Sequence, residues 1–198
     1  MKYIHLIRHG ATEGNLKAMF YGNTDLPLSR EGESSIDDLT KKGLYPNPEK
    51  AVYYTSGLLR TEQTLSLIYG NKLHTKLGKL KEINFGDFEL KTHEELQDLP
   101  EYISWINANS EHAAPPGGES IAEFKNRVLS SFDLILASDE EHSVVVCHGG
   151  VIGVIMAKIT GDEEDVYKWI PNPGYGYTIT FVDGNPAGFT SFKEDENK

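Results

Sequence analysis

Residues 4–15 read Ile4-His5-Leu6-Ile7-Arg8-His9-Gly10-Ala11-Thr12-Glu13-Gly14-Asn15. The first part alternates and is apolar, as in a short buried strand, and the pattern breaks at Gly10 into small and polar residues. A strand that ends at Arg8 and His9 presents a cation and an imidazole at its carboxyl end, where open α/β sheets bind their ligands. For an isolated Arg-His pair, a merely solvated strand end is an equal alternative, so the other strands must distinguish the two.

Two further stretches predict buried strands that end in polar residues. Residues 51–55 are β-branched and aromatic, and residues 144–147 form a continuous apolar run that is typical of a central strand. Ser56 and Arg60 follow the first of these, and His148 with two glycines follows the second. If the three strands are neighbours, two arginines and two histidines meet at one edge of a sheet.

Helices are predicted between these strands. A polar N-cap with an acidic residue in the first turn marks helix starts at Ser29, Thr92 and Ser120. Residue patterns predict further helices over 58–69 and 151–158, and two late strands over 176–182 and 187–192 about a turn at 183–186. We therefore expect an α/β fold, a single domain over residues 1–198 built as a three-layer sandwich. Its central sheet is mostly parallel with an antiparallel edge, and helices cover both faces. The charged residues 193–198 are expected to fray.

The overall charge limits the classes of partner. The chain has 198 residues and a formal net charge of -11, which disfavours nucleic acid and anionic membranes because both need basic patches. A small anionic substrate is still compatible, since charges are screened over about 8 Å at physiological salt. No apolar run is long enough for a membrane span, no signal peptide is expected, and the single cysteine, Cys147, fits a reducing cytoplasm. The oligomeric state stays open.

A pocket with two arginines and two histidines suits a phosphate dianion, because guanidinium groups match the geometry of its oxygens. Asn15 and the backbone N–H groups around Gly149 add neutral donors. Cys147 is disfavoured as a nucleophile because a cysteine phosphatase needs an arginine six positions later, where Gly153 stands. There is no nucleotide-binding P-loop, and five histidines show no metal-ligand spacing. These are His5, His74, His93, His112 and His142.

The stretch from Leu6 to Asn15 resembles the signature of the histidine phosphatase superfamily, which includes cofactor-dependent phosphoglycerate mutase, fructose-2,6-bisphosphatase and α-ribazole phosphatase. Four later blocks resemble the family's motifs in the family's order, so the resemblance covers nearly the whole chain. The phosphatase branch with α-ribazole phosphatase is the part of the family that the chain is most similar to. The four blocks are Ser56–Thr64, Glu82–Gly86, Pro116–Ser120 and His148–Gly150.

The resemblance implies a role for each matched residue. His9 would attack phosphorus and become a phosphohistidine, and Glu82 would give a proton to the leaving oxygen. The residues implied to hold the phosphoryl oxygens are Arg8, Arg60 and His148. The expected substrate contacts are Asn15, Thr12, Tyr21, Gly22 and Gly149.

Physical chemistry is consistent with these roles. An attacking imidazole must be neutral, and the two nearby arginines disfavour protonation of His9 by like-charge repulsion. A bound phosphate dianion favours the protonated form of Glu82, which a general acid needs. The chain departs from the family pattern at Phe88, Leu90 and Thr61, which we interpret as changes in the pocket wall. Two tryptophans, Trp105 and Trp169, are expected to pack in the core or in a lid.

We therefore expect a phosphatase that hydrolyses small phosphorylated metabolites without a metal or other cofactor, with α-ribazole phosphate as the named candidate substrate. One alternative is a cofactor-dependent phosphoglycerate mutase. We disfavour it because those mutases carry a long insertion between the proton-donor loop and the later Glu-Ser block, whereas here only a short helical stretch separates Glu82 from residues 117–120. A second alternative is a binding module for phosphorylated ligands, which would need neither His9 nor Glu82.

Overall fold

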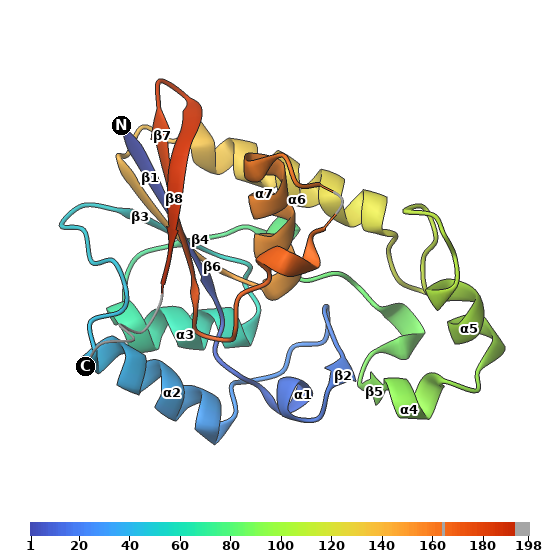
Figure 1. Ribbon diagram of the computed structural model, residues 1–198. Helices are drawn as coiled ribbons and strands as arrows, with labels where there is room; N and C mark the ends of the chain where they lie inside the picture. Colours follow the sequence, from blue (N-terminus) through green and yellow to red (C-terminus); the bar gives the residue numbers. More distant parts are fainter. Residues whose placement is uncertain (164, 193–198) are drawn as a thin grey trace.

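A six-stranded mixed sheet lies at the centre of the structure, a computed structural model that describes residues 1–163 and 165–192 (Figure 1). The strand order is β4-β3-β6-β1-β7-β8; the first four strands are parallel, and β7 and β8 pair antiparallel with their neighbours. The predicted mostly parallel sheet with an antiparallel edge is confirmed. Residues 193–198, the predicted frayed tail, lie outside the described residues. The strands are Lys2–Arg8 (β1), Val52–Thr55 (β3), Thr75–Lys76 (β4), His142–Cys147 (β6), Gly176–Val182 (β7) and Asn185–Ser191 (β8).

The three strands with polar residues at their ends are direct neighbours. Strand β6 lies between β3 and β1, and its register pairs Arg8 with Cys147 and Thr55 with Val146. The three strands therefore end at the same edge of the sheet, which places the residues that follow them within reach of one another.

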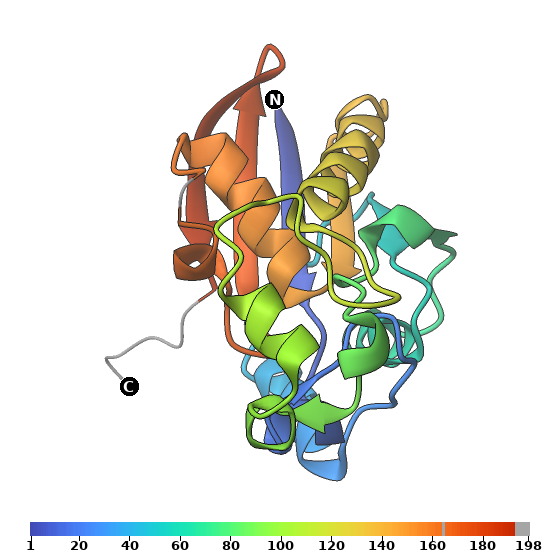
Figure 2. The same cartoon turned by 90° about the vertical axis from the view of Figure 1, so that its right-hand side faces the viewer.

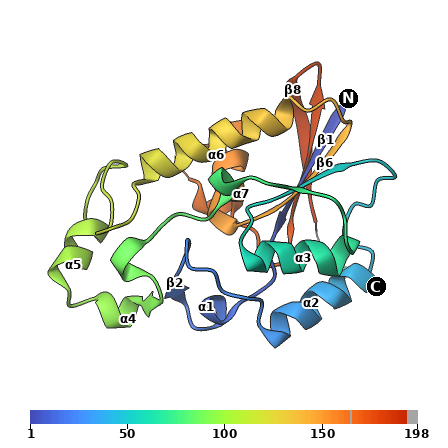
Figure 3. The same cartoon turned by 180° about the vertical axis from the view of Figure 1, so that it is seen from behind.

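Helices cover both faces of the sheet, as predicted (Figures 1 and 3). Because successive strand residues point to opposite faces, Leu6 packs with α6 and α7 while Ile7 packs with α2 and α3. Both side chains are fully buried, so the sheet is covered on its two sides. The four helices are Arg30–Lys41 (α2), Leu59–Tyr69 (α3), Ile121–Leu136 (α6) and Gly149–Thr160 (α7).

Local sequence determines where most helices begin. The hydroxyl of Ser29 accepts a hydrogen bond from the N–H of Gly32, and the capping boxes predicted at Thr92 and Ser120 are both present. Helix α7 begins at Gly149, two residues before the start that the sequence predicts, because Gly149 and Gly150 have low helix propensity. Their place in the first turn depends instead on side chains that approach from other parts of the chain.

The late hairpin is tighter than expected. Strand β8 begins at Asn185 after a turn at Asp183 and Gly184, both with positive φ, whereas the sequence had suggested a turn over 183–186. Pro186 is tolerated within β8 because β8 is an edge strand and its pairing with β7 is irregular between Thr180 and Phe181.

A smaller layer lies beyond the carboxyl edge of the sheet, at the end away from the N-terminus (Figure 2). An aromatic cluster packs it together: Phe20, Phe85, Phe88, Tyr102 and Trp105. Trp169 packs against Tyr177 and Phe189, so the packing predicted for both tryptophans is confirmed. The short elements are Glu13–Leu16 (α1), Met19–Phe20 (β2), Gly78–Leu80 (η1), Gly86–Phe88 (η2), Lys91–Thr92 (β5), His93–Leu96 (α4), Pro100–Ile106 (α5) and Tyr167–Trp169 (η3).

Within residues 1–163 and 165–192, no helix combines the length and the apolar character that crossing a membrane requires.

Candidate active site

The residues that follow β1, β3 and β6 meet in one buried cluster. The rings of His9 and His148 lie edge to face with centroids 5.1 Å apart, and the Nε of Arg60 donates to Nδ1 of His148 at 3.3 Å. All three side chains are almost inaccessible to solvent, with exposed fractions of 3%, 0% and 0% for His9, His148 and Arg60. Residues 9, 60 and 148, which are far apart in the sequence, are therefore brought into direct contact.

One hydrogen bond fixes the tautomer of His9. Its Nδ1 lies 2.7 Å from the carbonyl oxygen of Gly10, and because a carbonyl can only accept, Nδ1 must carry the proton. The other nitrogen, Nε2, then presents its lone pair. The orientation of this potential nucleophile is set by the neighbouring residue at the end of β1.

The surroundings keep His9 neutral. Burial lowers its pKa well below the ordinary value of 6.5, the positive charges of Arg60 and Arg8 lower it further, and the hydrogen bond to Gly10 opposes the shift. The lowering of the His9 pKa by the two arginines agrees with the expectation from the sequence. Burial, the larger cause, depends on tertiary packing.

His148 is held by a chain of hydrogen bonds. Because Arg60 donates to its Nδ1, the ring proton is on Nε2, which donates to the hydroxyl of Ser56 at 2.8 Å. Ser56 in turn contacts Thr61 Oγ1 at 3.2 Å, and Thr61 donates to the carbonyl of Leu58 at 2.7 Å. Burial and then the positive charges of Arg60 and Arg8 lower the pKa of His148 well below 6.5.

The interpretation of Thr61 and Phe88 as pocket-wall residues stays a prediction, and the structure gives both residues internal contacts. Thr61 is fully buried behind His148, where it completes the hydrogen-bond chain. Phe88 is 2% exposed and packs on Tyr102 and Trp105 in the aromatic cluster. Leu90 is exposed, with a positive φ of 63°, and pairs with Phe20 through its backbone N–H.

Arg8 lies against the N-terminus of α7. Its Nη1 donates to the carbonyl of Pro171 at 2.7 Å, whereas its buried Nε has no partner among the described residues. A Cβ on Gly149 would stand 3.1 Å from the Arg8 guanidinium, so glycine at this position allows the close approach. A buried guanidinium with an unpaired N–H is suited to an anionic ligand.

Glu82 reaches the same helix terminus from the other side. Its Oε2 accepts from the N–H of Gly150 at 2.9 Å, and its Oε1 accepts from the N–H of Ile83 at 3.0 Å. A Cβ on Gly150 would stand 2.4 Å from the carboxylate, so this glycine too is required for a close approach. The first two glycines of α7 thus allow Arg8 and Glu82 to approach one helix N-terminus.

The Arg60 guanidinium is fixed by a loop. It donates to the carbonyls of Gly22 at 2.7 Å and Thr24 at 2.9 Å, and it lies 5.0 Å from the ring centroid of Tyr21. Tyr21 and Gly22 therefore contact Arg60, and their assignment to substrate binding stays a prediction.

Glu89 holds that loop in turn, although sequence reasoning did not assign it a role. Its carboxylate accepts from the backbone N–H groups of Gly22 (3.1 Å), Asn23 (2.8 Å) and Thr24 (2.7 Å), and from that of Phe85 (3.2 Å). Burial alone would raise the pKa of Glu89, but these hydrogen bonds outweigh it and lower the pKa. The only sequence signal was its position between Phe88 and Leu90, two residues at which the chain departs from the family pattern.

Thr12, Asn15 and Tyr21 form a network at the start of α1. Thr12 caps this helix and donates to the Tyr21 hydroxyl at 2.7 Å, which donates to Oδ1 of Asn15 at 2.7 Å. The Asn15 side-chain oxygen is therefore occupied, and its NH₂ group has no partner in the part of the chain that the structure describes. An Asn15 contact to substrate would use this donor.

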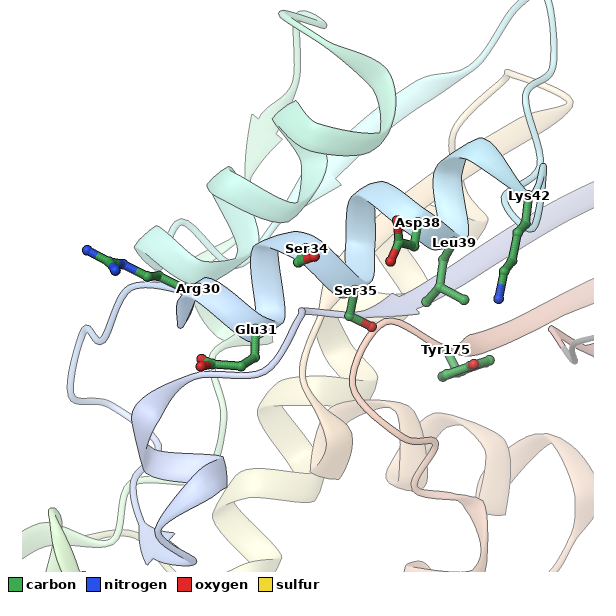
Figure 4. Close-up of a pocket in the computed structure, with 8 residues that line it drawn as sticks. All are labelled: Arg30, Glu31, Ser34, Ser35, Asp38, Leu39, Lys42 and Tyr175. Atoms are coloured by element: carbon green, nitrogen blue, oxygen red, sulfur yellow. The ribbon is translucent and has the colours of Figure 1, made fainter.

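A groove along α2 is separate from this cluster (Figure 4). Tyr175 faces α2 across it, and charges of both signs line it, including Arg30 and Asp38. None of the residues of the histidine cluster lines this groove. No group of three or more His, Cys, Asp or Glu side chains in residues 1–163 and 165–192 is arranged to hold a metal ion.

This arrangement, two histidines and two arginines with a carboxylate at the edge of a mixed sheet, defines a class of protein. A family model of the histidine phosphatase superfamily (branch 1) matches residues 4–191, and the chain belongs to that superfamily.

The relatives that this chain resembles include proteins named as phosphatases and proteins named as mutases. The adenosylcobalamin/alpha-ribazole phosphatase of Escherichia coli is 30% identical over 166 residues, which are 79% of this chain and 78% of that protein. The 2,3-bisphosphoglycerate-dependent phosphoglycerate mutase of Beijerinckia indica is 30% identical over 169 residues, 79% of this chain and 80% of that protein. The solved structure of the alpha-ribazole phosphatase from Shigella flexneri matches with a TM-score of 0.83 at 25% identity, over 93% of each chain.

Proposed function

We propose that this protein is a single-domain phosphatase that hydrolyses small phosphorylated metabolites through a phosphohistidine on His9. The observation that carries the proposal is the tautomer of His9, whose lone pair on Nε2 lies in a buried cluster with Arg60 and His148. A neutral imidazole with a defined lone pair is a competent nucleophile toward phosphorus. A protein that only bound phosphorylated ligands would have no need of it.

The proposed reaction has two steps. In the first, Nε2 of His9 forms a bond to phosphorus as the bond to the leaving oxygen breaks, and Glu82 gives its proton to that oxygen. In the second, water attacks the phosphohistidine, the Glu82 carboxylate accepts a proton from the water, and inorganic phosphate leaves. His9 and Glu82 then return to their starting forms.

Positive charge from the protein itself would stabilise the transferring group. Arg8 contributes an unpaired buried N–H, and Arg60 contributes the N–H groups that its loop leaves unused. Together with His148 these cations face the oxygens on which charge accumulates during transfer. The proposed mechanism therefore needs neither a metal ion nor a cofactor, and the buried thiol of Cys147 fits the reducing cytoplasm where we place the enzyme.

Trapping the intermediate tests this proposal. We expect mass spectrometry after brief cold exposure to an aryl phosphate to find phosphate on His9, with and without a chelator. We expect His9→Ala to lower kcat by at least about 10³-fold, whereas His112→Gln, a change at a solvent-exposed histidine, leaves it unchanged. Chelator-sensitive activity that magnesium or zinc restores, together with an active His9→Ala enzyme, would contradict the proposal.

For the substrate we propose α-ribazole phosphate, and for the reaction hydrolysis rather than mutase transfer. Between Glu82 and the Glu119-Ser120 block the only α-helices are the short α4 and α5, and there is no long insertion, so we expect water to reach a phosphohistidine more easily than it would in a mutase. A panel should include α-ribazole phosphate, 3-phosphoglycerate with catalytic 2,3-bisphosphoglycerate, and phosphoserine, since a relative from Hydrogenobacter thermophilus is named for phosphoserine. Fast isomerisation of 3-phosphoglycerate with little free phosphate would favour the mutase alternative.

A further inference from the structure

A single arginine outside the cluster gathers the backbone around Glu82. Arg127 lies on α6, and its Nη1 donates to the carbonyls of Lys79 and Lys81, each at 2.7 Å. Its Nη2 donates to the carbonyl of Glu82 itself at 2.9 Å. One planar guanidinium therefore ties three carbonyl groups of the same loop to a long helix.

Glu119 completes this attachment on the other side of Glu82. Its carboxylate accepts from Nε of Arg127 at 2.8 Å and from Nη2, and it also accepts from the backbone N–H of Asn84 at 2.8 Å. The backbone N–H of Glu119 donates to the carbonyl of Asn84 at 3.0 Å. The two side chains are about one-fifth exposed, so solvent screens the pair less than it screens a surface ion pair.

The segment before Glu119 packs closely on the same loop. The N–H of Asp87 donates to the carbonyl of Pro116 at 2.8 Å. A Cβ on Gly118 would stand 2.5 Å from the carbonyl oxygen of Asn84, so only glycine allows the two backbones this contact. Backbone contacts from the 116–119 segment thus hold residues 84–87, and Arg127 holds residues 79–82.

We propose that Arg127 and Glu119 are positioning residues that aim the Glu82 carboxyl at the leaving oxygen. The inference rests on the proposed function, in which Glu82 is the proton donor. Fixing the main chain on both sides of Glu82 fixes the direction of its side chain, and proton transfer in the transition state requires the carboxyl to lie within hydrogen-bond reach of the leaving oxygen. Neither residue hydrogen-bonds to His9, His148, Arg8 or Arg60 within the described residues, so both act through Glu82.

Substrates with different leaving groups can distinguish a loss of Glu82 alignment from general damage to the phosphate site. An alkyl phosphate needs a proton on its leaving oxygen, whereas p-nitrophenyl phosphate has a good leaving group and needs little help. Loss of Glu82 alignment therefore lowers kcat/KM for the alkyl substrate more than for the aryl substrate. A general disturbance of the phosphate site would lower both equally.

The informative variants are Arg127→Lys, Glu119→Gln and Glu82→Gln, with glycerol phosphate and p-nitrophenyl phosphate as substrates. Arg127→Lys keeps the positive charge, which also acts on His148, but cannot span three carbonyls with one flat group. We expect Arg127→Lys and Glu119→Gln each to lower kcat/KM for glycerol phosphate by about tenfold or more, and for p-nitrophenyl phosphate by less than about threefold. As a control on the same helix, Lys125→Met removes the ion pair between Lys125 and Glu111 and should leave kcat/KM unchanged for both substrates.

A double-mutant cycle separates the inference from the proposed function. In the Glu82→Gln background, Arg127→Lys should lower kcat/KM by no more than about twofold further, because the group it aims is already gone. If Glu82→Gln lowers kcat/KM more for the alkyl than for the aryl substrate, but Arg127→Lys and Glu119→Gln lower kcat/KM equally for both, the inference alone is overturned. If Glu82→Gln itself lowers both substrates equally, Glu82 is not the donor and both fail. Circular dichroism shows whether Arg127→Lys folds. If it does not fold, the milder variant Glu119→Gln tests the inference by the same comparison of kcat/KM for the two substrates.

Discussion

At the scale of single residues, the two histidines differ in which nitrogen carries the proton. His9 is protonated on Nδ1 and His148 on Nε2, because each has one partner whose role is unambiguous. The carbonyl of Gly10 can only accept, and the guanidinium of Arg60 can only donate. As a result Nε2 of His9 can attack, whereas neutral His148 has no N–H left for a phosphoryl oxygen.

This tautomer of His148 predicts proton uptake when phosphate binds. To donate to a phosphoryl oxygen, Nδ1 of His148 must gain a proton, and the arriving dianion favours that by opposing the effect of the arginines. We expect proton uptake when inorganic phosphate binds at pH 8, where free phosphate is already a dianion, and we expect the share of His148, up to about one proton, to remain in Glu82→Gln. Calorimetric titration in buffers of different ionisation enthalpy measures it.

Ser56→Ala is the matched variant for that measurement. Without the Ser56 hydroxyl as acceptor at 2.8 Å, the neutral ring is no longer held in the Nε2–H tautomer, so uptake should decrease. Equal uptake of zero in both proteins would show that His148 does not donate from Nδ1.

At the scale of elements, two loops support different parts of the site: the loop Gly22–Thr24 holds Arg60, and the loop Glu82–Phe85 carries Glu82. Glu89 bridges them, because it accepts from Gly22 and from Phe85. A Cβ on Gly22 would stand 1.6 Å from the carbonyl oxygen of Ile83, so the loops are in direct backbone contact. The Gly22–Thr24 loop fixes Arg60, and the other fixes Glu82.

Glu89→Gln should therefore affect catalysis in a different way from Arg127→Lys. Glutamine has only one acceptor oxygen, so when that oxygen accepts from Gly22 and Phe85 its NH₂ group faces the N–H of Thr24, and the Arg60 guanidinium loses its fixed support. Because Arg60 faces the phosphoryl oxygens in the proposed mechanism, we expect kcat/KM to decrease by about 10- to 100-fold for aryl and alkyl phosphates alike. Parallel steady-state assays check this, with Glu94→Gln as the exposed control. A loss confined to the alkyl substrate would instead associate Glu89 with Glu82.

Much of the fold followed from local sequence. The apolar runs of β1 and β6 and the caps at Ser29 and Ser120 are local features, and each was predictable within a few residues. The supporting residues of the site were not, because their partners are distant in sequence. Glu89 is 67 residues from Gly22, and Arg127 is 48 residues from Lys79. No residue pattern along the chain indicates that an arginine of α6 will meet three carbonyls of another loop.

At the scale of the whole molecule, several buried histidines link folding to pH. Burial lowers the pKa of His9, of His148 and of His5, the last to about 4, where His142 adds to the effect. Each folded-state pKa lies below the unfolded value of about 6.5. The unfolded chain therefore binds more protons below pH 6.5, and the stability that these neutral histidines contribute is present above that pH and decreases as the pH falls.

We expect the free energy of unfolding to decrease between pH 6.5 and 5 by up to about 1.4 kcal/mol per pH unit for each of these histidines. Glu62 and Glu89 have lowered pKa values, so the stability they contribute is lost only below their ordinary value of 4.5 and does not affect this interval. Urea unfolding at several pH values measures the slope. His5→Gln should remove one histidine's share, and a slope that is the same in His5→Gln and the natural chain would refute the assignment of His5.

The aromatic layer beyond the sheet has a consequence for how this enzyme can be altered. None of the hydrogen bonds described for Arg8, His9, Arg60, Glu82 and His148 involves residues 93–114, which carry α4 and α5. This segment is joined to the rest by edge-on and tilted contacts of the Tyr102 and Trp105 rings, and by Glu111, which pairs with Lys125 and accepts from the N–H of Ala122. We therefore expect it to be an exchangeable cassette: a loop graft there should alter which metabolite is admitted while the machinery for breaking the phosphate ester is inherited intact.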